Sequence, residues 1–395
     1  MTGASGRTEH SVGEILRRWG PEYSRGHRLT PEQRRTLEAL SRCRTAELGG
    51  HRERCPECAF ERPVYNSCGD RNCPTCQGIR SRRWLAARLD ELLPCPYFHC
   101  VFTLPDALNA LVFLAPERFY TLLFRAAWRT LRALFQRHGL GEPGVIAVLH
   151  TWGQTLCLHP HVHCIVTGGG LSADGKTWHA ASPEFLLDVF EMSEEFRKGF
   201  CRLLRYHARH FGGQSAVDLA NEQASREWVV FCQAPPNGAP GVMAYLARYS
   251  YRTAIANRRI LEVTDDGRVT FEWKDYRAAE AGQAPPVRPM DLDADEFIRR
   301  FLQHILPDSF KRIRCFGLLA GGAKTKKLAA CRRLLPTGTL FMPVQPPVAA
   351  AAEFDPDAMR RCPHCGALME PADPLPAARG PPLVQPFAGG LAHAA

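Results

Sequence analysis

The sequence has no long hydrophobic run: none of its apolar stretches reaches the roughly 18 residues that a membrane-spanning helix needs. Its first residues, MTGASGRTEHSVGE, lack the apolar region of a secretory signal peptide. A phosphate-binding loop of the G-x-x-x-x-G-K type is also absent, and no repeat of domain size is visible. We therefore expect a cytoplasmic protein without an ATP-binding loop of this type.

Acidic residues are fewer than basic ones. The 40 Asp and Glu stand against 50 Lys and Arg, which gives a net charge of +10 and a pI near 9.0. The basic residues gather at residues 78–89, 297–314 and 324–335. Clustered positive charge of this kind predicts a nucleic-acid partner, and 395 residues with 45% hydrophobic content allow two or three folded domains.

The sixteen cysteines predict zinc rather than disulfides, because several fall in C-x-x-C pairs in a chain expected in a reducing compartment. Cys55–Cys58 and Cys73–Cys76 are two C-P-x-C knuckles, and four thiolates from two such turns satisfy tetrahedral zinc. We predict that these four form one zinc ribbon within an N-terminal domain. Further candidate ligands are Cys43, His51 and Cys68, and the cysteine count leaves a second zinc ion open.

A third knuckle, Cys362–Cys365, lies close to the end of the sequence. It supplies half a zinc site and needs two partners. Cys331 is a candidate for one of them, but no second knuckle stands near it in sequence. The pattern leaves two interpretations open, a zinc half-site and an orphan turn.

Strand and helix patterns alternate in the middle of the chain. Period-2 and period-3.6 hydrophobicity predict, in order, a strand at 96–104, a helix at 115–139, strands at 144–152 and 161–168, a helix at 182–213, a strand at 228–233 and a helix from about 240. This β-α-β-β-α-β-α order predicts an α+β fold with a split βαβ arrangement on an antiparallel sheet.

The segment HPHVHCIVTGGG begins the 161–168 strand and carries an imidazole at every second position. His159, His161 and His163 can share one face of the strand, because alternate residues point the same way. Two neutral imidazoles on a rigid strand make half of a divalent-metal site. The competing interpretation is a polar sheet face whose histidines are inert.

Two tyrosines stand four residues apart in AYLARYSYR. Tyr245 and Tyr249 share a helix face at this spacing, and Arg248 and Arg252 beside them suit phosphate better than a core. A phenol is a poor nucleophile near pH 7, so its attack on a phosphodiester requires a cation. We expect Mg²⁺ or Mn²⁺ on the histidines, with Gln154 or His159 as a third ligand and Asn257 as a weaker candidate.

The composition shifts along the chain divide it into four predicted segments. These are a cysteine-rich, zinc-binding domain at 1–95, a strand-and-helix domain with the histidine and tyrosine motifs at 96–262, a hairpin and basic helical region at 263–345, and a Pro/Ala-rich tail with the third knuckle at 346–395. The hairpin turns at Asp266-Gly267, a helix is expected at 292–306, and the last 25 or so residues are expected to be disordered. Arginines of the 78–89 segment, namely Arg80, Arg82 and Arg83, are expected to contact DNA.

The ordered set of motifs resembles the insertion-sequence-91 transposases, which are HUH enzymes. The matching runs are CRTAELGGHRERCPEC, CPTCQG, PYFHCVFTLP, HPHVHCIVTGGG, YLARYSYRTAIANRRI, VTFEWKDYR and FKRIRCFGLLA, in collinear order over about residues 15–335. The resemblance implies an N-terminal zinc-binding domain that recognises the element's end, followed by an HUH endonuclease domain. It implies His161 and His163 as metal ligands, Tyr249 as principal nucleophile and Tyr245 as the second tyrosine.

The sequence departs from the family pattern at two positions. Asn72 stands where the family commonly has a histidine before the second knuckle, and Tyr251 stands where a histidine is frequent, so neither inherits a role. The resemblance implies a rolling-circle transposase that cuts and rejoins single-stranded or hairpin DNA through a 5′-phosphotyrosine. The alternatives are a plasmid replication initiator or relaxase, and a zinc-ribbon regulator without catalysis.

Overall fold

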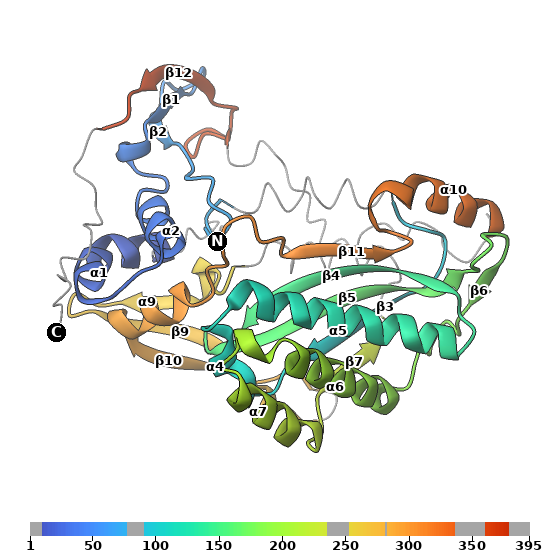
Figure 1. Cartoon of the computed structure of the whole chain (residues 1–395). Helices are drawn as coiled ribbons and strands as arrows, with labels where there is room; N and C mark the ends of the chain where they lie inside the picture. Colours follow the sequence, from blue (N-terminus) through green and yellow to red (C-terminus); the bar gives the residue numbers. More distant parts are fainter. Residues whose placement is uncertain (1–9, 77–90, 235–252, 281–282, 336–359, 379–395) are drawn as a thin grey trace, which may run out of the picture.

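A six-stranded sheet lies at the centre of the molecule (Figure 1). The structure is a computed structural model, and it describes residues 10–76, 91–234, 253–280, 283–335 and 360–378. The strand order is β11-β4-β5-β3-β7, with β6 paired to the end of β5, and all the pairings are antiparallel. The strands are β3 (Tyr97–Thr103), β4 (Glu142–Trp152), β5 (Leu158–Leu171), β6 (Trp178–Ala180), β7 (Val230–Gln233) and β11 (Ile313–Gly317).

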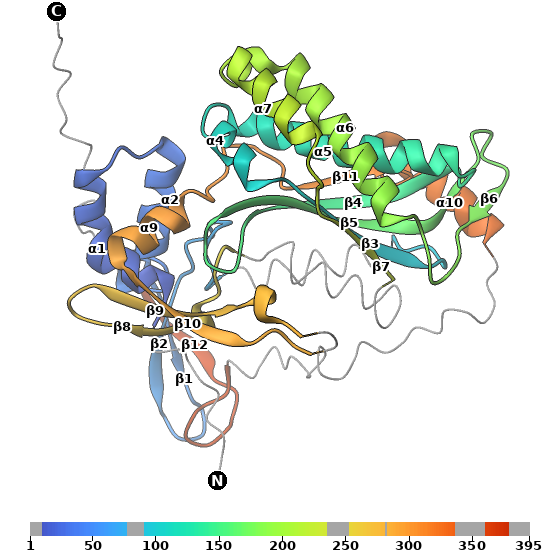
Figure 2. The ribbon, with the colours of Figure 1, turned by 90° about the horizontal axis from the view of Figure 1, so that it is seen from below.

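Helices cover one face of this sheet (Figures 1 and 2). They are α4 (Asn109–Val112), α5 (Pro116–Arg137), α6 (Val189–Tyr206) and α7 (Gln214–Ala224). The sequence predicted a helix from residue 182, but α6 begins only at Val189. The Asp188 side chain accepts the backbone N–H groups of Phe190 and Glu191, and this N-cap sets the start of the helix.

The connections interlock two split βαβ units. In the first unit, α5 connects β3 to β4, and β5 lies between these two strands. In the second unit, α6 and α7 connect β5 to β7, and β3 lies between these two strands. This is the order that the sequence pattern predicted for the α+β class with an antiparallel sheet, and the structure confirms it.

The two faces of β5 have different environments. Val162, Cys164 and Val166 face the helices and belong to the main hydrophobic core. The intervening residues face the other way, where Ile165 packs in a smaller core with helix α10 (Lys324–Leu334). His161 and His163 lie on this second face, near the start of β5, whereas Lys327 of α10 contacts Glu142, which is paired with Leu171 at the far end of β5.

A second body packs at the histidine end of the sheet. Helices α1 (Val12–Gly26) and α2 (Pro31–Ser41) share one hydrophobic core with α9 (Ala294–Leu302) and with a three-stranded sheet. The sheet strands are β8 (Ile260–Val263), β9 (Arg268–Lys274) and β10 (Val287–Asp293), in the order β10-β9-β8. The predicted capping box of Thr30 and Gln33 is present at the start of α2. The predicted 1–95 and 263–345 segments therefore contribute to a common core.

A third, smaller sheet contains strands from both ends of the chain (Figure 1). Its order is β12-β1-β2, and its strands are β1 (Gly50–Arg54), β2 (Glu61–Tyr65) and β12 (Glu370–Leu375). Strand β12 pairs antiparallel with β1 across some 300 residues of sequence. The β1–β2 hairpin fits the ribbon that the sequence predicted, whereas the added strand β12 was not predicted.

No helix in the described part of the chain is long and apolar enough to cross a membrane. Three expected features fall on residues 77–90, 235–252 and 379–395. They are the basic segment at 78–89, the tyrosine helix and the end of the tail, and they lie outside the described residues. The disorder expected from about residue 371 is wrong for the first residues of that stretch, because β12 pairs there with β1.

Candidate functional site

Three imidazoles converge at one end of the central sheet. The ligand nitrogens of His150, His161 and His163 all lie within 4.8 Å of one another, an arrangement able to hold a metal ion. His161 and His163 project from β5 as strand alternation predicted, and His150 of β4 is the register partner of His161. We call these residues the three-histidine group.

The environment of His161 prepares one nitrogen for a metal. Its Nδ1 lies 2.7 Å from the His159 carbonyl oxygen, so the Nδ1–H donates there and the lone pair is left on Nε2. Burial lowers the pKa of His161 to about 4. The ring is therefore neutral near pH 7, which is the protonation state that a ligand requires.

His163 is held in the same way by another imidazole. Its Nδ1 lies 2.9 Å from His99 Nε2, and burial lowers the pKa of His99 to about 4. The Nε2 atoms of His161 and His163 are only 3.1 Å apart. When both Nδ1 atoms carry the proton, these two Nε2 lone pairs repel each other, and a cation between them removes the repulsion. The donor set therefore fits a divalent metal.

The three-histidine group opens into a pocket of about 500 Å³. Phe231, Tyr276 and Arg259 line it together with the histidines. The Arg259 guanidinium donates to the carbonyl oxygens of Gln154, at 2.6 Å, and Glu272, at 2.7 Å. These bonds hold a positive charge at the wall, beside the histidines, where a phosphate would enter.

The residues expected as third ligand lie near the group but outside it. His159 lines the pocket, and its ring forms an ion pair with Asp106 at 3.5 Å. Gln154 also lines the pocket, and its backbone carbonyl oxygen accepts a hydrogen bond from Arg259. Asn257 is turned to the second body, where it accepts from the Val12 N–H and donates to Thr75 Oγ1. The sequence reasoning missed His150, although the adjacent strands at 144–152 and 161–168 carried the signal: an antiparallel pairing sets their ends opposite each other.

The tyrosines and arginines of the predicted site lie outside the described residues. They are Tyr245, Tyr249, Arg248, Arg252, Arg80, Arg82 and Arg83. The roles expected for them remain predictions.

The cysteine knuckles form two groups rather than one. Cys73 and Cys76 meet Cys43 and Cys68, with the Cys43 and Cys73 sulfurs 3.5 Å apart and the Cys68 and Cys76 sulfurs 3.8 Å apart. We call this the first cysteine group. Tetrahedral zinc with Zn–S bonds of about 2.3 Å has sulfur–sulfur edges of about 3.8 Å, so this set has the dimensions of a zinc site. Hydrogen bonds from the other three thiols lower the pKa of Cys43.

The predicted grouping of Cys55 and Cys58 with Cys73 and Cys76 is therefore corrected. Cys55 and Cys58 lie instead beside Cys362 and Cys365, all four sulfurs being within 4.8 Å of one another; we call these the second cysteine group. The β1–β2 hairpin carries the first knuckle away from the second, toward the strand β12. His51 belongs to neither group, since it lies in β1 and pairs with Glu53 at 3.7 Å. Cys331 belongs to α10 and is buried in the smaller core, where it meets neither cysteine group.

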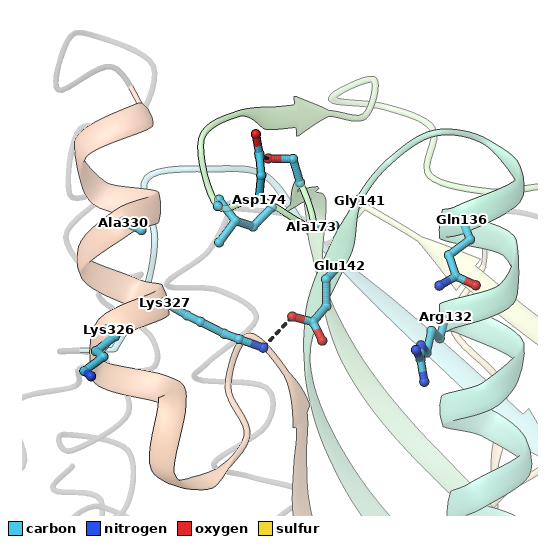
Figure 3. A pocket seen from close by; sticks show the side chains of 12 residues that line it. Arg132, Gln136, Gly141, Glu142, Ala173, Asp174, Lys326, Lys327 and Ala330 are labelled. Atoms are coloured by element: carbon cyan, nitrogen blue, oxygen red, sulfur yellow. Dashed lines mark hydrogen bonds and ion pairs between the residues drawn. The ribbon is translucent and has the colours of Figure 1, made fainter.

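Another pocket, of about 550 Å³, lies at the opposite end of β4 and β5 (Figure 3). Arg132 and Lys326 line it, but so do the carboxylates of Glu142 and Asp174, and Lys327 pairs with Glu142 at 2.5 Å. Its charges largely offset one another, and no titratable cluster of the kind found at the histidines is present among its lining residues. We assign the reactive site to the histidine end.

Comparison with known proteins identifies the chain's relatives. A family model described as "Putative transposase" matches residues 144–327, and one described as "Transposase zinc-binding domain" of the insertion-sequence-91 type matches residues 15–104. The chain is 41% identical over 384 residues to "Putative transposase y4qJ" of Sinorhizobium fredii, covering 91% of this chain and 94% of the relative. The chain belongs to the insertion-sequence-91 transposase family.

A second relative of this family is more distant. It is the "Transposase for insertion sequence element IS801" of Pseudomonas savastanoi pv. phaseolicola, 28% identical over 358 residues, which cover 85% of this chain and 82% of the relative. No solved structure matches the chain. The transposase is thus a DNA-cutting and strand-joining enzyme with a zinc-binding domain, as the sequence motifs predicted.

Proposed function

We propose that this transposase moves its element by a rolling-circle route, nicking and rejoining single-stranded ends through a 5′-phosphotyrosine. The observation that carries the proposal is the three-histidine group in an open pocket next to Arg259. Buried neutral imidazoles without a catalytic use are costly to keep so close together, whereas a metal-dependent nuclease needs them.

The chain's own residues divide the work at the scissile phosphate. His150, His161 and His163 would hold the metal, and a bound Mn²⁺ or Mg²⁺ supplies charge neutralisation at the phosphate. Three imidazoles favour Mn²⁺ over Mg²⁺, since no carboxylate joins the group among the described residues. Arg259 adds a fixed positive charge at the pocket wall.

The covalent step transfers the phosphate to Tyr249. Its phenol oxygen loses a proton and attacks phosphorus, the bond from phosphorus to the 3′ oxygen breaks, and that leaving oxygen takes up a proton. The products are a 5′-phosphotyrosine and a free 3′-OH, which primes synthesis or attacks a later junction. One phosphodiester replaces another, so the step conserves bond energy without ATP, and Tyr245 provides a second acceptor for a second strand.

The DNA partner would be an exposed strand rather than a regular duplex. A phenol must reach the phosphate in line with the leaving oxygen, and a single strand or hairpin distorts more easily than a helix. Arg80, Arg82, Arg83, Arg248 and Arg252 would supply phosphate contacts, and aromatic side chains such as Phe231 in the pocket would stack on bases.

The decisive experiment looks for the covalent adduct. Purified protein is incubated with labelled single-stranded element ends and Mn²⁺, and the adducted tyrosine is mapped by mass spectrometry. We expect Tyr249→Phe to abolish the adduct while binding is retained. Tyr276→Phe is the matched control, because Tyr276 lines the histidine pocket but has no assigned chemistry.

Other outcomes select other mechanisms. An adduct on Tyr276, or a wild-type amount of adduct in Tyr249→Phe, would contradict the assignment of the nucleophile. No cleavage by the wild type, with zinc-dependent binding intact, would favour a regulator with inert histidines. Cleavage of a plasmid origin but not of element ends would favour a replication initiator or relaxase.

A further inference from the structure

We propose that Cys55, Cys58, Cys362 and Cys365 form a second structural zinc site, which makes the C-terminal knuckle part of the zinc-binding domain. Residues 360–378 lie outside both matched family models, which end at residues 104 and 327. The inference is independent of the proposed nicking chemistry.

The sulfur positions are those of a zinc site. Cys55 Sγ lies 3.3 Å from Cys365 Sγ, and Cys58 Sγ lies 3.5 Å from Cys362 Sγ. These separations are close to the edge of about 3.8 Å expected for four thiolates around zinc. The second group has the same four-cysteine chemistry as the first, although its two knuckles are more than 300 residues apart in sequence.

The two knuckles have the same backbone geometry. In each, the N–H of the first cysteine donates to the carbonyl five residues on: Cys55 to Phe60 at 2.8 Å, and Cys362 to Ala367 at 2.7 Å. In each, the residue four positions on has a positive φ and donates its N–H to the first cysteine's carbonyl. Those residues are Ala59, with φ 58°, and Gly366, with φ 78°. An orphan turn has no reason to repeat the geometry of a ligand-bearing turn and face it.

Backbone pairing holds the C-terminal segment on the N-terminal hairpin. Strand β12 pairs with β1 from Gly50 opposite Leu375 to Arg54 opposite Glu370, and Phe60 stacks on His364 with ring centroids 4.4 Å apart. Gly49, with φ 63°, permits the close approach, because a Cβ there would lie 2.7 Å from the Leu375 carbonyl oxygen.

This small module has too little hydrophobic core to hold itself together. Its buried core consists of Cys55, Cys362 and Met369, with Phe60 and Ala367 packed against it. Two of the three buried residues are cysteines of the group itself. Modules of this size need a metal to fold, so zinc would supply the free energy that keeps β12 on β1. Residues 360–378 would then complete, through this zinc site and the β1–β12 pairing, the domain that α1 and α2 begin.

The first test counts zinc in the intact protein. By inductively coupled plasma mass spectrometry, we expect the double variant Cys362→Ser with Cys365→Ser to hold one zinc ion fewer per chain than the wild type. The control is Cys157→Ser with Cys315→Ser, which should keep the wild-type zinc content because neither cysteine belongs to a group. Hydrogen exchange should show lost protection of residues 50–54 in the first variant alone.

The second test works even where the variant folds poorly. A protease site inserted between residues 336 and 359 of the full chain is cut after purification. We expect the fragment carrying residues 360–395 to stay bound to the rest and to be released when a strong chelator removes zinc. Equal zinc contents of the wild type and the double variant, or release of the fragment without loss of a zinc ion, would overturn the proposal.

Discussion

At the scale of single residues, the site depends on keeping imidazoles neutral and correctly oriented. His161 and His163 each have one ring nitrogen occupied, by the His159 carbonyl and by His99 respectively. The other nitrogens then point at a common position with His150. Burial lowers the pKa of His161 and of His99 to about 4, so these two rings stay neutral through small changes of pH near 7.

The residue that completes the metal site is open to direct test. His150→Ala should lower nicking of single-stranded ends by about 100-fold or more, the usual effect of losing a group that stabilises charge in the reaction. His159→Ala and Gln154→Ala should each cost less than about tenfold, because both lie outside the three-histidine group. Rates at saturating Mn²⁺ and Mn²⁺ affinities by calorimetry measure this. A larger loss in His159→Ala or Gln154→Ala than in His150→Ala would restore the ligand expected from the sequence.

At the scale of elements, buried polar contacts connect the second body to the central sheet. Arg71, just before the Cys73 knuckle, donates to the carbonyls of Leu306, Pro307 and Phe310 at 2.8 to 3.0 Å. His304, just after α9, accepts from Thr151 Oγ1 at 3.1 Å and donates to the Leu156 carbonyl at 3.0 Å. Each contact provides hydrogen bonds to polar groups that would otherwise be buried without a partner or water.

Arg71→Ala should destabilise the docked zinc-binding domain by about 3 kcal/mol, because a charged donor and three acceptors lose their bonds together. Arg71→Lys should recover only part of this, since an ammonium lacks the planar fork that reaches three carbonyls. Urea unfolding followed by tryptophan fluorescence provides the measurement, and Arg277→Ala on the exposed surface is the control. Equal stability of Arg71→Ala and the wild type would show that this contact does not hold the domain.

His304 should make the junction sensitive to acid. Burial lowers its pKa to about 4, below the unfolded value of about 6.5, so the unfolded chain binds the proton more readily. The contribution to stability is complete above pH 6.5 and is lost as the pH falls toward 4. Between pH 7.5 and 5 this amounts to roughly 2 kcal/mol.

The comparison that isolates His304 is His304→Gln against His179→Gln, because His179 is exposed in β6. The difference between the denaturation midpoints at pH 7.5 and pH 5 should be smaller in His304→Gln than in the wild type, and should keep its wild-type size in His179→Gln. It should not vanish in His304→Gln, because burial also lowers the pKa of His161 and of His99 to about 4. An unchanged pH dependence in His304→Gln would assign the acid sensitivity to other buried histidines.

At the scale of the whole molecule, the zinc-binding domain, the second body and the central sheet combine recognition with cutting. Helices α1 and α2 share a core with α9 and β9, and Asn257 joins Thr75 of the second knuckle to the chain that follows the tyrosine segment. The domain expected to recognise the element's end is therefore anchored beside the histidine end of the sheet (Figure 2). We expect binding and cutting to act on one continuous stretch of DNA.

Binding to a single-stranded end should depend strongly on salt. Each phosphate contact to a single strand contributes about 0.7 to the slope of log affinity against log salt, so replacing Arg80, Arg82 and Arg83 by alanine should reduce the slope by about 2. Replacing Arg205, Arg209 and Arg226, which are exposed on the helix-covered side, is the control. Filter binding across salt, on single-stranded and duplex forms of one end, gives both slope and preference. A flat slope or equal affinity for the two forms would make these arginines ordinary surface charges.

The sequence by itself determined what local chemistry encodes. Strand alternation placed His161 and His163 on one face, the capping box of Thr30 and Gln33 started α2, and the order of strands and helices predicted the split βαβ sheet. These features depend on residues a few positions apart, where backbone geometry alone sets the outcome.

Tertiary structure decided which distant groups meet. His150 joins the histidines through the register of β4 on β5, and Cys55 and Cys58 meet Cys362 and Cys365 through the pairing of β1 with β12. Each C-x-x-C turn supplies two of the four thiolates of a zinc site, so any two such turns in the chain could form one. The spacing within a turn therefore does not tell which other turn it joins. The selection depends on strand pairing and on the path of the backbone, because only these bring ligands within the few ångströms that a metal requires.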